Sequence, residues 1–115
     1  MLTVAVLSIG AVFLMNHNRG EGESHTIREM GQETVIIIDE FLDGTLASED
    51  ARVFIDHMLE AIDYHVQSRR DSLSIRETNI RQAMSGLSLD LAFPNPVQIR
   101  TNRNRLAELV GMPER

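Results

Sequence analysis

A chain of 115 residues is long enough for one domain at most. A net charge of −6 argues against a general nucleic-acid binder, whose affinity comes from neutralising phosphates, and 4% aromatic residues are too few for a platform that stacks single-stranded bases. The chain has no cysteine, which excludes disulfides and thiolate metal sites. We therefore expect no nucleic-acid partner.

Residues 1–15 carry no charge, and their only polar side chains are those of Thr3 and Ser8. A cleaved signal peptide is disfavoured, because no basic residue precedes this run and no small-x-small cleavage site follows it. Two interpretations remain, a membrane anchor or an element buried in a protein core. As a helix the run is only ~22 Å long, against a hydrocarbon core of ~30 Å. We favour a single-pass anchor over residues 1–17, accommodated by local thinning or by neighbours in a larger membrane complex.

The polar segment 18–25 follows the apolar run and predicts a linker. The nearest basic residues, Arg19 and Arg28, both lie after the run. Basic residues favour the cytoplasmic side of a membrane, so if the run is an anchor these two charges predict that the body of the protein faces the cytoplasm.

The segment Thr26-Ile27-Arg28-Glu29 has the capping-box pattern and predicts the start of a helix. Apolar residues then recur at helical spacing as far as Leu42, and Gly44 marks a break. The β-branched run from Val35 to Ile38 is equally compatible with a buried strand. We favour a helix over this segment.

The clearest helix begins at Ser48, a natural N-cap followed by two acidic residues that complement the helix dipole. From Ala51 to Val66 the apolar residues form one face. A second capping box, residues 74–77, opens another helix, which we expect to stop near Gly86.

The hydrophobic period changes over residues 88–101, where apolar and polar residues alternate on both sides of a Pro-Asn-Pro turn. This pattern predicts two short extended pieces about the turn. Unpaired extended pieces can add to the sheet edge of another protein or lie in a groove, so we expect partner docking here. The predicted docking residues are Leu89, Leu91, Phe93, Val97 and Ile99.

A last helix is expected over residues 102–110, ended by Gly111 and Pro113. The sequence thus predicts a mainly α fold, in which a short N-terminal apolar helix precedes a small helical domain over residues 26–115. That domain is a bundle of three to four helices with an extended segment near residues 88–100.

No catalytic, cofactor or metal signature is complete. The string from Val35 to Glu40 is similar to the strand and acidic pair of P-loop ATPases, but the chain has no phosphate-binding loop and no lysine. His57 and His65 lie eight residues apart on one predicted helix, hence ~12 Å apart and too far to share a metal. A nucleophile elbow is also absent. We expect a protein that is not an enzyme and holds no cofactor.

Residues 41–51, with the Leu-Asp-Gly turn and the acidic helix start, and the following His57-Met58-Leu59 resemble the helix-turn-helix of zinc-binding anti-sigma factors. The resemblance covers about nineteen residues and implies a helical hairpin. The cysteines that complete the zinc site of that family are missing here, so the resemblance implies no metal site.

These observations predict a non-catalytic, membrane-anchored accessory or assembly subunit that docks on a partner protein in a larger complex. The alternative is a small soluble helical regulator, or an immunity-like binding protein, whose apolar N-terminus is a core or oligomerisation helix.

Overall fold

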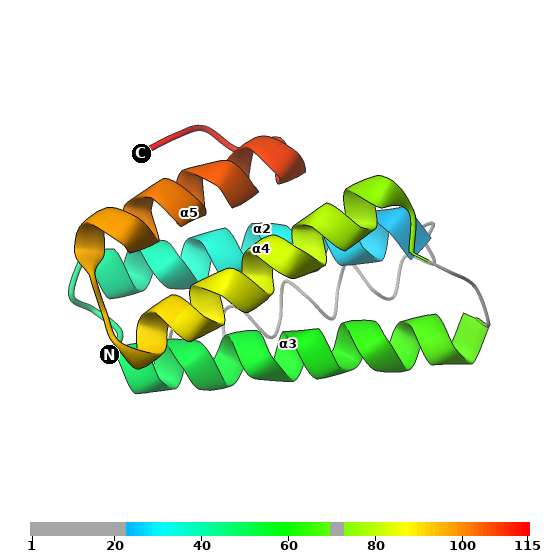
Figure 1. Ribbon diagram of the computed structural model, residues 1–115, viewed down its shortest axis with the longest axis horizontal. Coiled ribbons are helices and arrows are strands. Elements are labelled where there is room, and N and C mark those ends of the chain that lie inside the picture. Colours follow the sequence, from blue (N-terminus) through cyan, green and yellow to red (C-terminus); the bar gives the residue numbers. More distant parts are fainter. Residues whose placement is uncertain (1–22, 70–72) are drawn as a thin grey trace.

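The computed structural model describes residues 23–69 and 73–115, which form a bundle of four helices (Figure 1). The helices are α2 (Glu23–Leu42), α3 (Ser48–Arg69), α4 (Ile75–Ala92) and α5 (Pro96–Val110). The α2–α3 and α4–α5 turns lie at one end of the bundle, and α3 leads into α4 at the other end (Figure 1). The predicted mainly α fold is confirmed.

The predicted anchor and most of the predicted linker lie outside the described residues. Residues 23–25, at the end of that linker, belong to α2. Within residues 23–69 and 73–115, no helix combines the length and the apolar character that crossing a membrane requires.

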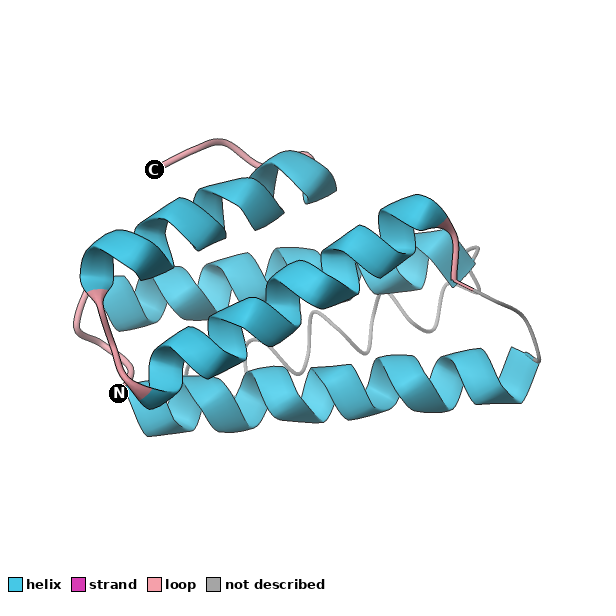
Figure 2. Cartoon of the chain, in the orientation of Figure 1, coloured by secondary structure: helices cyan, strands magenta, loops and turns pink. Residues whose placement is uncertain are grey.

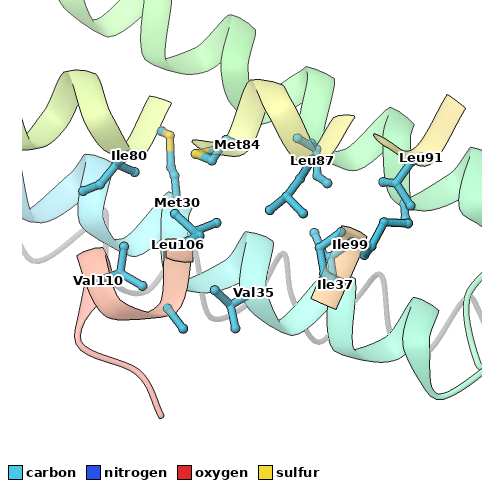
Figure 3. Close-up of a cluster of buried hydrophobic side chains, with 14 of the residues drawn as sticks. Met30, Val35, Ile37, Ile80, Met84, Leu87, Leu91, Ile99, Leu106 and Val110 are labelled. Carbon is cyan, nitrogen blue, oxygen red and sulfur yellow. The ribbon is translucent and has the colours of Figure 1, made fainter. Parts of the chain in front are cut away.

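The core consists of aliphatic side chains from all four helices, and Figure 3 shows Leu87 and Leu91 of α4 facing Ile37 of α2 and Ile99 of α5. The largest fully buried side chains are Ile27, Val35, Ile37, Ile38, Ile55, Ile62, Ile80, Met84, Leu87, Ile99, Leu106 and Val110. Three of these belong to the β-branched run of α2. That run is helical, because burial of its side chains outweighs the modest helix-propensity cost of β-branching.

Gly31 allows α2 to approach α4 and α5 closely. A Cβ at this position would lie 2.7 Å from Val110 Cγ1 and 3.0 Å from Ile80 Cγ2. Glycine in a helix interior costs ~1 kcal/mol relative to alanine, and here the packing of three helices offsets that cost.

The predicted capping box at the start of α4 and the predicted glycine stop at the end of α5 are both confirmed. Ser74 Oγ accepts from Glu77 N (3.1 Å) while Glu77 Oε1 accepts from Ser74 N (2.9 Å), which is a complete capping box. Gly111 ends α5 in the left-handed conformation, with φ of 75°. The other capping box is not at a helix start, because α2 begins at Glu23 and Thr26 lies inside it.

The predicted extended segment over residues 88–101 is wrong. α4 continues through Gly86 to Ala92, and α5 begins at Pro96 instead of residue 102, so only Phe93 to Asn95 connect them (Figure 2). The alternation arises because α4 carries apolar residues on two opposite faces, one in the core and one exposed to solvent. Pro96 occupies the first turn of α5, where a proline is compatible with a helix.

A buried ion pair joins the C-terminal helix to α2. The Arg103 guanidinium donates to both carboxylate oxygens of Asp39 (2.8 and 2.9 Å) and to the carbonyl of Pro113 (2.7 Å). Arg115 also pairs with Asp39 and with Asp43, which ties the last residues back to the α2–α3 end. The pKa of Asp43 is lowered because its carboxylate accepts from Arg115.

Candidate functional site

The five predicted docking residues divide into two groups. Leu89, Phe93 and Val97 are exposed over 68%, 89% and 76% of their surface, whereas Leu91 and Ile99 are 2% and 0% exposed and belong to the core. The buried pair cannot touch a partner in this fold. We call the exposed three the α4–α5 corner, because they flank the turn between these helices.

The α4–α5 corner is held by polar contacts on both sides of the turn. Asn95 caps α5, and its side-chain oxygen accepts from Val97 N (3.1 Å) and Gln98 N (3.3 Å). Asn102 Nδ2 donates to Asp90 Oδ2 (2.5 Å), which joins α5 to the last turn of α4. The exposed apolar side chains therefore project from a turn with a defined geometry.

A polar groove of about 620 Å³ runs between α4 and α5. Its lining includes Arg76 and Arg105 with the amides of Asn79, Gln82 and Asn102. Arg76 donates two hydrogen bonds to the carbonyl of Leu109 (3.2 and 3.0 Å), which join α4 to the end of α5. Glu108 also lines this groove.

A second groove, of about 630 Å³, lies between α2 and α3, and most of its wall is carbon. We call it the α2–α3 groove. Met30 of α2 and Ala61 of α3 contribute to its wall, and the exposed ring of Tyr64 lies at its edge. His65 also lines this groove, and its Nε2 is buried without a hydrogen-bond partner among the described residues. Sequence reasoning missed this groove, since every residue in it fits an ordinary amphipathic helix.

Two buried glutamates lie beside the α2–α3 groove. Glu29 and Glu33 are only 6% and 5% exposed. Gly31 marks the side of α2 that faces α4 and α5. Each glutamate lies two residues from Gly31, which is a rotation of ~200° around the helix, so both point away from that side. Burial raises the pKa of Glu33 to about 7, and the carboxylates of Glu29 and Glu40 add to the shift. This side of α2 is therefore desolvated.

The remaining candidate motifs have structural roles. Among the described residues no group of three or more histidine, aspartate and glutamate side chains is arranged to hold a metal ion. The apolar run ending in Asp39 is helical, and Asp39 is paired with Arg103 across 64 positions of the sequence. The sequence carried no signal for that pairing, because nothing local links the two residues.

Comparisons of the chain with protein-family models, with curated protein sequences and with solved structures give no match.

Proposed function

We propose that this chain is a non-catalytic subunit that docks on a partner protein through the α4–α5 corner and is attached to a membrane by residues 1–15. The exposure of Leu89, Phe93 and Val97 is the observation that carries the docking proposal. These side chains are not needed to complete the core, which is built from other residues of the same helices. Exposed apolar clusters of this kind mark interaction sites.

Two properties of the α4–α5 corner, an exposed aromatic side chain and a fixed turn, support the docking proposal. Phe93 is 89% exposed, more than any other large hydrophobic side chain among the described residues, and aromatic side chains commonly dominate the binding energy of protein interfaces. Because the turn is fixed by Asn95 and Asn102, little ordering entropy is lost when a partner binds.

The docking test is photo-crosslinking in the cells that produce the protein, with a crosslinking residue at Gln98, next to the corner. A specific adduct should form with the unaltered corner and be reduced at least tenfold by Phe93→Asp, which places a charge at the centre of the contact. Ile75→Asp is the matched control, since Ile75 is equally exposed (84%) but lies at the other end of α4. An adduct that survives Phe93→Asp, or that Ile75→Asp reduces equally, contradicts docking at the corner.

The membrane attachment rests on the uncharged run of residues 1–15. The full chain should remain in the membrane pellet after carbonate and high-salt washes, and a chain lacking residues 1–17 should be released. Release of the full chain by either wash contradicts the anchor.

A further inference from the structure

We propose that the α2–α3 groove is the binding site for this chain's own residues 1–15 whenever they are not inserted in lipid. This inference goes beyond the proposed docking function and does not depend on the α4–α5 corner. The groove lies at the opposite end of the bundle from that corner, because it is formed by the first half of α2 and the second half of α3.

The character of the groove matches the segment. Its wall is mostly carbon, and residues 1–15 are uncharged. Transfer of such a segment from water to this surface is favourable by ~25 cal/mol for each Å² of apolar area buried. The segment also carries two hydroxyls, on Thr3 and Ser8, either of which can donate to the buried Nε2 of His65.

The poorly hydrated side of α2 adjoins the groove. Thr26 and Met30 line the groove, and helical spacing places Glu33 on the same side of α2, one turn beyond Met30. The Glu33 side chain is buried, and this burial raises its pKa, so this edge of α2 is poorly hydrated.

The chain length permits this contact within one molecule. Residues 16–22 separate the segment from α2, and seven residues span up to ~25 Å, which is enough for the chain to turn back on itself. A helix of fifteen residues is ~22 Å long and fits beside α3, whose 22 residues extend ~33 Å. An occupant attached this closely has a high effective concentration compared with a second molecule.

The test uses spin labels on the full chain, which has no natural cysteine. Labels are placed at Leu7→Cys, in the middle of the segment, and at Tyr64→Cys, on the exposed edge of the groove. Because Leu7 is central, the distance depends little on the direction in which the segment lies. In buffer without lipid we expect one narrow distribution below about 25 Å, since packed helix axes are ~8–10 Å apart. The control pair Leu7→Cys and Val97→Cys should give a clearly longer distance.

A broad distribution or a long distance for the Leu7 and Tyr64 pair overturns the proposal. So does a short distance in a mixture of the two singly labelled chains, because the segment then occupies a second copy. Precipitation of the full chain without lipid also overturns it, since the segment would then be uncovered.

A substitution in the wall of the groove tests whether the segment binds there or only lies near it. Ala61→Arg should abolish the short distance, whereas Gln82→Arg, on an exposed site of α4, should preserve it. Retention of the short distance in Ala61→Arg overturns the proposed site.

Vesicles of phosphatidylcholine and phosphatidylglycerol test the membrane attachment on its own. Loss of the short distance on adding them supports the anchor, whereas an unchanged distance contradicts the anchor and leaves the groove assignment intact.

Discussion

The two sides of the bundle are held together in different ways. α4 is joined to α3 by Arg81 and Asp63 (2.9 Å) and by Ser88 and Asp56 (2.5 Å), and to α5 by Arg76 and the carbonyl of Leu109. Between α2 and α3 a weak polar contact runs from Thr34 Oγ1 to Met58 Sδ at 4.0 Å.

This difference separates two kinds of apolar surface. Around α4, side-chain contacts join this helix to α3 and α5, and the exposed residues of the α4–α5 corner take no part in the core. Along the α2–α3 groove an apolar wall is open, so an apolar element that lies on it gains from burial. We propose that the α4–α5 corner serves another molecule and that the α2–α3 groove serves the chain's own residues 1–15.

The largest expected effect distinguishes the two faces of α4. Leu91→Ala removes a buried side chain and should lower the free energy of unfolding by ~2–5 kcal/mol. Leu89→Ala, two residues earlier on the exposed face, should change it by no more than ~0.5 kcal/mol. Urea unfolding followed by circular dichroism measures both. Equal effects of the two substitutions would show that the corner is part of the folding core.

The second expected effect concerns the desolvated side of α2. The pKa of Glu33 is about 7 in the folded protein, above its ordinary value of 4.5, so the unfolded chain releases this proton first as the pH rises. The free energy of unfolding should therefore fall between about pH 4.5 and pH 7.

Glu33→Gln should remove most of that decline and raise the free energy of unfolding at pH 8 by ~1–3 kcal/mol, since one pKa unit is worth ~1.4 kcal/mol. Glu60→Gln, on an exposed site of the same groove, is the control and should have little effect. A pH profile that is identical in the parent chain and in Glu33→Gln contradicts the desolvation of this side.

The smallest expected effect concerns the polar contacts of α4. The Arg81 guanidinium holds the pKa of Asp63 below its usual range through a paired hydrogen bond. Arg81→Gln should raise the Asp63 pKa toward its ordinary value in an NMR titration and cost ~0.3–1 kcal/mol of stability, because the pair is half-exposed. The loss should shrink in 1 M salt. A loss of several kcal/mol would mean that this pair, and not the core, holds α3 to α4.

Local signals in the sequence predicted much of the fold. Ser74 with Glu77, Ser48, and Gly111 mark helix ends through contacts within four residues, and the structure has helix ends at or beside each of them. Such contacts depend on neighbours along the chain, which a single sequence displays directly.

The segment from residue 88 to 101 was misjudged because its apolar residues serve two faces. Leu91 continues the inner stripe begun by Met84 and Leu87, while Leu89 and Phe93 form an outer stripe, and together they imitate the alternation of a strand. Asn95 and Pro96, which suggest a turn between strands, are equally suited to the start of a helix.

The candidate sites were less accessible to sequence reasoning. The exposed members of the α4–α5 corner were among the predicted residues, but their separation from Leu91 and Ile99 required knowledge of which helix face is buried. The α2–α3 groove and the Asp39–Arg103 pair depend on contacts between distant segments, for which the sequence has no local signal.

Hydrogen exchange in lipid-free buffer tests the contrast between the two sides most directly, by comparing the full chain with a chain lacking residues 1–17. We expect the amides of α2 and α3 along the groove to lose protection in the shortened chain, while those at the α4–α5 turn exchange at unchanged rates. Equal protection of α2 and α3 in the two chains would contradict the account, because the groove would then be complete without residues 1–15.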